Sequence, residues 1–161
     1  MGSELKILID SCVWVDSYLG DHPRHDESVA FIQEAYESGA QLLYGASKLE
    51  TVFSVLTAEV KRMIRREKGI VEESDAAAVR AFAWGCVENI RSYATAIGMD
   101  DSDLWLASKY RSINSDLEDN VLLAAAQRAD VDYVVSWDKD VLRIPVIKGA
   151  NPAQMRELLK L

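Results

Sequence analysis

The chain has 161 residues and a formal net charge of −8, with 49% hydrophobic and 27% charged residues. This length and composition are those of a single globular domain over residues 1–161, large enough to bury a sizeable core. An acidic surplus argues against a protein that holds nucleic acid unspecifically, unless part of it forms a metal site. The longest apolar run, Val121 to Ala126, is far shorter than the roughly 20 residues of a membrane span, so we expect a cytoplasmic protein that contacts no membrane.

The two cysteines and the first three residues carry little functional information. Cys12 and Cys86 lie in helix-like patterns without partners at metal-ligand spacing, so we expect buried free thiols rather than a disulfide or a zinc site. Met1-Gly2-Ser3 is either a native start or a cloning remnant, and we exclude it from the fold prediction.

The N-terminal half alternates short β-prone runs with helical patterns. Leu5 to Ile9 is almost continuously apolar, as in a strand buried on both faces, and Asp10 follows it directly. Apolar residues at helical spacing and glycine stops predict the segments that come next. These are a short helix that Ser11 can cap and that ends at Gly20, a helix over 26–38, a strand over 42–44, and long helices over 47–68 and 74–97 that we expect to pack as a hairpin.

The C-terminal half continues this alternation. Its predicted segments are a helix over 102–111, a helix starting near Asp119, a strand over 133–136, a β-prone run over 144–147 and a terminal helix from Asn151-Pro152 to about 159. Pro145 favours an edge position for the last β-prone run. This order of strands and helices predicts an α/β fold with a small parallel sheet.

Four carboxylates fall at equivalent points of this predicted fold. Asp10 follows the first strand, and Glu50 lies in the first turn of the helix after the second strand. Asp119 opens a helix, and Asp138 follows a later strand. Strand ends and the following helix starts share one edge of a parallel sheet, where ligands bind. Carboxylates gathered there repel one another, and a hard divalent cation such as Mg²⁺ or Mn²⁺ is the usual resolution.

Most of these acids also have a purely structural interpretation. Ser47 and Glu50 have capping-box spacing, Asp116 and Asp119 suit helix caps, and Asp138 and Asp140 suit a turn. Asp10 is the exception, because a buried strand that ends in a carboxylate is an uncommon choice for stability alone. The joint occurrence of all four acids favours a site.

Four segments carry a family resemblance: Ile7-Leu8-Ile9-Asp10-Ser11, Ser47-Lys48-Leu49-Glu50, Asp116-Leu117-Glu118-Asp119-Asn120 running into Leu122 to Ala126, and Val134-Val135-Ser136-Trp137-Asp138-Lys139-Asp140. Over residues 5 to about 158 the chain resembles the PIN-domain ribonucleases, and the last two segments are the most specific. The resemblance implies a three-layer α/β/α fold with a small, mostly parallel central sheet. It also implies metal-dependent cleavage of RNA phosphodiester bonds.

The resemblance implies a role for each matching residue. Asp10, Glu50, Asp119 and Asp138 correspond to the catalytic metal ligands, with Asp116 and Asp140 as further metal-ligand candidates and Ser136 as a support, where the family usually has threonine. The hydroxyl of Ser136 would orient the metal shell or a water. Trp137 stands where the family more usually has a small or polar residue, which departs from the pattern beside Asp138.

The family includes many toxins of bacterial and archaeal toxin-antitoxin pairs. The implied partners are therefore an RNA substrate, an antitoxin protein and a second copy of the chain in a homodimer. The alternatives are an RNA-processing nuclease without a toxin role and a non-catalytic binding domain. A receiver-like domain is disfavoured, because Leu42 to Gly45 offers no phosphoacceptor aspartate, and a haloacid-type phosphatase is disfavoured because Cys12 stands in place of its second aspartate.

Overall fold

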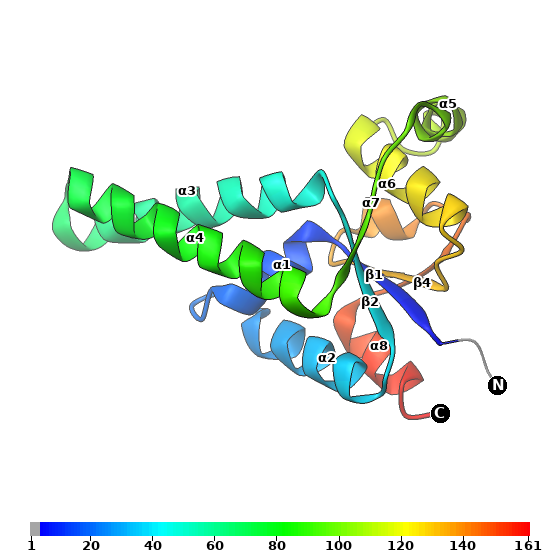
Figure 1. The fold of residues 1–161 in the computed structure, drawn as a ribbon, viewed down its shortest axis with the longest axis horizontal. Helices are drawn as coiled ribbons and strands as arrows, with labels where there is room; N and C mark the ends of the chain where they lie inside the picture. Colours follow the sequence, from blue (N-terminus) through cyan, green and yellow to red (C-terminus); the bar gives the residue numbers. More distant parts are fainter. Residues whose placement is uncertain (1–3) are drawn as a thin grey trace.

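The structure is a computed structural model that describes residues 4–161, and Met1-Gly2-Ser3 lies outside the described residues. Within that range, five strands form one all-parallel sheet in the order β3-β2-β1-β4-β5 (Figure 1). In chain order the elements are β1 (Lys6–Ile9), α1 (Ser11–Tyr18), α2 (His25–Glu37), β2 (Gln41–Gly45), α3 (Lys48–Lys68), α4 (Glu73–Tyr93), β3 (Thr95–Ile97), α5 (Asp101–Tyr110), α6 (Leu117–Arg128), β4 (Tyr133–Val135), α7 (Lys139–Leu142), β5 (Lys148–Ala150) and α8 (Pro152–Leu158).

Helices cover both faces of the sheet, which confirms the predicted α/β/α fold. Successive residues of β1 point to opposite faces, so Ile7 and Ile9 pack on one side and Leu8 on the other. Buried residues of α1 to α4 and α8 meet the first face, and those of α5 to α7 meet the second. No helix within residues 4–161 is both long and apolar enough to cross a membrane.

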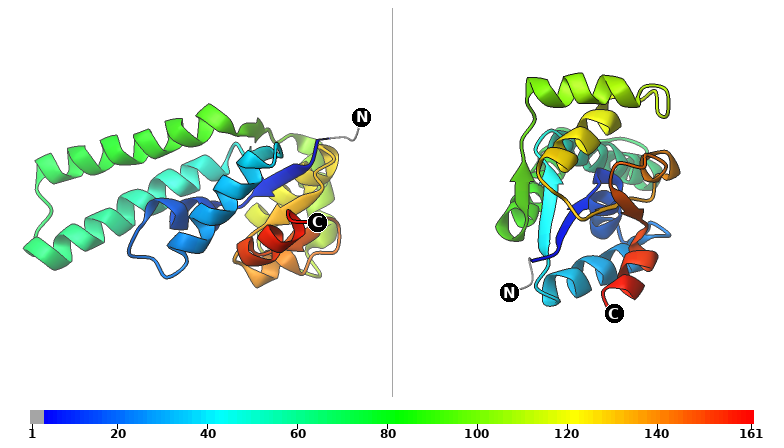
Figure 2. Two further views of the ribbon diagram at one scale, coloured as in Figure 1. Left: turned by 90° about the horizontal axis from the view of Figure 1, so that it is seen from below. Right: turned by 90° about the vertical axis from the view of Figure 1, so that its right-hand side faces the viewer.

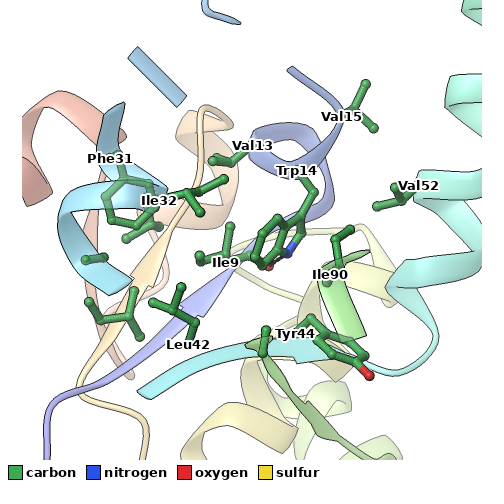
Figure 3. Packing of buried hydrophobic residues seen from close by; sticks show 14 of the residues in the cluster. Ile9, Val13, Trp14, Val15, Phe31, Ile32, Leu42, Tyr44, Val52 and Ile90 are labelled. Carbon is green, nitrogen blue, oxygen red and sulfur yellow. Dashed lines mark hydrogen bonds between the residues drawn. The ribbon is translucent and has the colours of Figure 1, made fainter. Parts of the chain in front are cut away.

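Trp14 fixes helix α1 to the end of β1. Its side chain is fully buried beside Ile9 (Figure 3). The indole Nε1–H donates a 3.1 Å hydrogen bond to the Ile9 carbonyl oxygen. The ring also packs edge-on against Tyr93, with the two centroids 6.0 Å apart. This anchor holds the turn that contains Asp10.

Helix α6 packs against the opposite face. Its residues from Asn120 to Ala126 are all buried, because the sheet lies on one side and α5 packs against another. The strand side chains of this core are Leu8, Leu43, Ile97 and Val134. The packing places the first turn of α6 at the edge where β1 and β4 end.

Helices α3 and α4 pack against each other and extend beyond the sheet as an arm, as the hairpin prediction expected (Figures 1 and 2). Gly69 ends α3 in a left-handed conformation with φ 82°. Phe53 and Trp84 join the two helices, with ring centroids 5.4 Å apart.

Two predicted segments differ from the structure. The helix predicted to reach Ile97 ends at Tyr93, because Ala94 adopts an extended conformation and Thr95–Ile97 pairs with β2 as β3. The β-prone run over 144–147 is a turn, and the edge strand β5 begins at Lys148. Both strands are three residues long, which is too short to show a clear alternation of apolar and polar residues.

Candidate active site

Asp10 joins the ends of three elements. It is buried, and its backbone N–H donates a 3.0 Å hydrogen bond to the Val135 carbonyl oxygen at the end of β4. Its Oδ1 accepts a 2.7 Å hydrogen bond from the Ser11 N–H and so caps α1, a role that the sequence had assigned to Ser11 itself. These bonds satisfy a carboxylate whose burial would otherwise be unfavourable.

Ser136 links the two predicted acids Asp10 and Asp138. Its fully buried hydroxyl donates a 2.8 Å hydrogen bond to Asp10 Oδ2 and accepts a 2.9 Å bond from the Asp138 N–H. A serine hydroxyl can do both at once, because it carries one hydrogen and two lone pairs. Ser136 therefore orients Asp10 and the segment that follows β4.

Cys12 lies against the side chains of Asp10 and Ser136. Its Sγ is 3.6 Å from Asp10 Oδ2 and 3.5 Å from Ser136 Oγ. Burial, and then the nearby Asp10 charge, raise the pKa of the Cys12 thiol to about 11. The thiol is therefore protonated at neutral pH. Both cysteines are free, and Cys86 is buried as predicted, whereas Cys12 is only half-buried.

Lys48 reaches into the acidic site from the first position of α3. Its side chain is only 6% exposed, and Nζ lies 3.2 Å from Asp119 Oδ1 and 3.9 Å from Asp10 Oδ1. Glu118 Oε1 is 3.1 Å from the same nitrogen. Three carboxylates thus converge on one ammonium.

The sequence analysis did not identify Lys48 as a site residue, although the residue carries a readable signal. A positive charge in the first turn of a helix opposes the helix dipole, which favours negative charge there. A lysine at this position of α3 therefore suggests a specific acidic partner. That partner is Asp119, 71 positions away in the chain.

Burial and ion pairing have opposite effects on these groups. Burial lowers the pKa of Lys48, but the charges of Asp10 and Asp119 and the hydrogen bond to Glu118 raise it, so the pKa lies above its ordinary value. Burial raises the pKa of Asp119, and Lys48 offsets part of that rise. Lys48 is therefore a cation at neutral pH.

The two aspartates at the start of α6 have different roles. Asp116 is the N-cap, and its Oδ1 accepts a 3.0 Å hydrogen bond from the Asp119 N–H. Asp119 lies in the first turn and directs its carboxylate to Lys48. Of the two, only Asp119 forms an ion pair with Lys48.

Glu50 and Asp138 are exposed. Neither belongs to the group of carboxylates that pair with Lys48, which is Asp10, Glu118 and Asp119. Glu50 lines a groove of about 410 Å³ between α3 and α4 with Phe53 and Trp84. The Ser47 side chain makes no capping hydrogen bond at the start of α3. Asp138 caps α7 by accepting a 2.8 Å hydrogen bond from the Asp140 N–H. Asp140 is also exposed, and its carboxylate pairs with Arg143 at 3.1 Å.

Residues 6–140 of the chain match the sequence profile of the PIN domain. The chain belongs to the PIN-domain family. The match includes all four segments on which the sequence resemblance depends, so that prediction is confirmed. Nucleases of this family are hydrolases that act on nucleic acids. No curated protein matches the chain in sequence.

Solved structures share the fold of this PIN domain at low sequence identity. VapBC2 from Rickettsia felis, bound to a DNA fragment from its promoter, gives a TM-score of 0.59 at 11% identity and covers 90% of this chain and 97% of its own. VapC20 from Mycobacterium tuberculosis, described as a sarcin-ricin loop cleaving toxin, gives 0.57 at 10% identity, with coverages of 84% and 92%. A protein from Pyrobaculum aerophilum gives 0.62 at 14% identity, with coverages of 97% and 96%.

The present arrangement of this PIN domain does not fit a divalent metal ion. PIN domains generally use divalent metal ions, for which carboxylate oxygens are suitable donors. Across residues 4–161, no group of three or more acidic, histidine or cysteine side chains is placed to hold a metal ion. Where Asp10 and Asp119 converge, the Lys48 ammonium contacts both of them. The donor chemistry suits Mg²⁺ or Mn²⁺, whereas the geometry suits an ammonium.

Trp137, the departure from the family pattern, is directed away from the acids. Its Nε1–H donates a 3.0 Å hydrogen bond to the buried Ser28 Oγ on α2. The Arg24 guanidinium lies over the ring, 4.8 Å from its centroid. Trp137 thus anchors the segment after β4 to α2.

Proposed function

We propose that this PIN domain is an endoribonuclease that hydrolyses RNA phosphodiester bonds. The observation that supports it best is the convergence of Asp10, from the end of β1, and Asp119, from the start of α6, at one edge of a parallel sheet. That edge is where ligands bind in sheets of this type. The choice of RNA is supported by the likeness to VapC20, which is described as a sarcin-ricin loop cleaving toxin.

Asp10 and Asp119 suit different tasks in such a reaction. Asp10 is held by Ser11 and Ser136 and has a side-chain exposure of 5%, so it is a rigid positioning group. Asp119 is 16% exposed and is the better placed to contact an attacking water. Glu50 and Asp138 complete the proposed catalytic set, and because both are exposed, their side chains can move without disturbing the core.

The proposal includes Mg²⁺ or Mn²⁺ as the cofactor. Its support is the general use of divalent ions by PIN domains, together with the oxygen-only chemistry of Asp10, Asp119, Glu50 and Asp138. Asp116 and Asp140 are secondary ligand candidates, and Ser136 is the supporting hydroxyl. The ion would supply positive charge to the phosphate, which the carboxylates themselves repel.

The experiment that tests the proposal compares RNA cleavage by the protein and by Asp10→Asn and Asp119→Asn. We expect each variant to lose activity by about 100-fold or more, because each loses one carboxylate of the proposed catalytic set. Asp101→Asn, which removes an exposed carboxylate from α5, is the matched control and should cleave normally. Full activity in both buried-site variants would contradict the mechanism, and a DNA substrate of the same sequence tests the choice of RNA.

We further propose that the protein is the toxin of a toxin-antitoxin pair and forms a homodimer. The likeness to VapBC2 and to the toxin VapC20 supports the toxin role. Co-expression with the product of the neighbouring reading frame should give a stable complex with reduced RNA cleavage, and light scattering should give twice the chain mass for the protein alone. Cleavage that this product does not inhibit would favour an RNA-processing nuclease without a toxin role.

A further inference from the structure

We propose that Lys48 is a built-in counter-cation of the acidic site, whose ammonium takes the place of a divalent ion between Asp10 and Asp119. A divalent ion then binds these two carboxylates only after Lys48 withdraws. The inference rests on the proposed function in so far as that function assigns these acids to the active site. It goes beyond that function because it concerns how the metal-free protein holds the acids together.

The distances support this exchange. Nζ lies 3.2 Å from Asp119 Oδ1 and 3.9 Å from Asp10 Oδ1, so one cation reduces the repulsion between the two acids. A divalent ion held by the same two carboxylates would compete with the ammonium for their oxygens. Two cations cannot share this position, because their charges repel in a site shielded from water.

The fold provides a close-fitting space for the lysine stem. Gly45 ends β2 beside it, and a Cβ added at Gly45 would lie 3.3 Å from Lys48 Cγ and 2.5 Å from Leu122 Cδ1. A larger residue at position 45 would therefore press against the Leu122 side chain of α6 and crowd the Lys48 stem. The buried position of Lys48 is thus part of the packing between β2, α3 and α6.

Glu118 offers Lys48 a second position. Its carboxylate lies 3.1 Å from Nζ, and its side chain is 51% exposed, so it lies at the rim of the site. The Thr51 hydroxyl donates a 3.0 Å hydrogen bond to the same Glu118 oxygen and holds it over α3. The flexible lysine stem can therefore move outwards and keep an acidic partner while Asp10 and Asp119 accept a metal ion.

The test is Mn²⁺ binding to the metal-free protein, measured by calorimetry and by the electron paramagnetic resonance signal of free Mn²⁺. Lys48→Met keeps the length of the stem and removes the charge. We expect it to bind Mn²⁺ about tenfold or more tightly than the unaltered protein, because no internal cation has to leave. Lys48→Arg keeps the charge and should bind no more tightly than the unaltered protein. Lys68→Met removes an exposed lysine charge at the far end of α3 and should also leave the affinity unchanged.

A second measurement covers the case in which Lys48→Met folds poorly without metal. Lys48→Gln keeps a hydrogen-bond donor for Asp119 but no charge, and its thermal midpoint should be lower than that of the unaltered protein in chelator and rise more on addition of Mn²⁺. Equal Mn²⁺ affinity and equal thermal response in the neutral variants and the unaltered protein would overturn the inference. Weaker binding in the neutral variants would also overturn it, since Lys48 would then assist the metal.

These binding measurements need no RNA, so they separate this inference from the proposed function. Tighter Mn²⁺ binding in Lys48→Met, with RNA cleavage that does not depend on Asp10, would support the inference and refute the function. Cleavage that depends on Asp10 and Asp119, with unchanged Mn²⁺ affinity in Lys48→Met, would support the function and refute the inference.

Discussion

The Ser136 hydroxyl lies 2.8 Å from Asp10 Oδ2, and this bond joins the C-terminal ends of β4 and β1. Both side chains are buried, so neither can exchange this partner for bulk water. The same hydroxyl accepts from the Asp138 N–H at 2.9 Å, which connects the buried acid to the start of α7. The position of Asp10 therefore depends on a residue 126 positions away in the chain.

Ser136→Ala should destabilise the protein by about 1–3 kcal/mol, because it leaves a buried carboxylate oxygen and the Asp138 N–H without their partner. Urea unfolding at neutral pH measures this change. Ser102→Ala is the matched control, because the Ser102 hydroxyl also donates to an aspartate, but at an exposed position. A loss no larger than that of the control would show that the buried bond is dispensable.

Gly45→Ala should destabilise the protein by about 1–3 kcal/mol, as expected for overpacking. The added Cβ would lie 2.5 Å from Leu122 Cδ1, so the Leu122 side chain has to move within the contact between β2 and α6. Gly85→Ala provides a control of opposite sign. Gly85 lies within α4 with no heavy atom within 4 Å of an added Cβ, so alanine there should stabilise by about 0.5–1 kcal/mol. Equal effects of the two substitutions on urea unfolding would contradict the close packing at Gly45.

The central part of the fold was predictable from the sequence because its elements are long or strongly apolar. β1 is buried and almost continuously apolar, and the long helices α3 and α4 show helical spacing over many residues. The edge strand β3 was not found, and the edge strand β5 was predicted at 144–147, directly before its actual position, since neither short strand shows a clear pattern. Thr95 to Ile97 also continues the helical spacing of α4, so only its pairing with β2 shows that it is a strand.

The candidate site was predictable only in part. The positions of Asp10 and Asp119 follow from the rule that strand ends and helix starts share an edge. The role of Lys48 does not, because it depends on the direction of one long side chain across a contact between α3 and α6. The pattern of acids at the sheet edge gives no indication that a lysine lies among them.

Arg128→Gln should lower the thermal midpoint at neutral pH by several degrees, and the difference should shrink in acid. Asp103 is 1% exposed and accepts from Arg128 Nε and Nη2, both at 2.9 Å. The hydrogen bond from Arg128 lowers the pKa of Asp103 below its ordinary value of 3.8, despite burial. A carboxyl group whose pKa is lower in the folded protein than in the unfolded chain stabilises the fold at pH values above its unfolded-state pKa. This stabilisation is lost as the pH falls through the folded-state pKa.

The control for this prediction is Arg91→Gln. Arg91 pairs with Glu88 at 3.1 Å on the surface of α4, and exposed pairs of this kind contribute little. Thermal scans of both variants from neutral pH to below 3.8 measure the difference. A gap between Arg128→Gln and the unaltered protein that persisted undiminished at the acid end would exclude Asp103 as its source.

Trp137→Phe should destabilise the protein by about 1–2 kcal/mol and leave RNA cleavage unchanged. Phenylalanine keeps an aromatic face for Arg24 but has no N–H to donate to Ser28, whose hydroxyl is fully buried. Trp105→Phe on α5 is the control, because Trp105 is 65% exposed, and it should change neither property. Urea unfolding and initial rates of RNA cleavage measure the two effects. Trp137 is directed towards α2, so we expect no contact with the substrate. A loss of cleavage without a loss of stability would contradict this and place the side chain against the substrate.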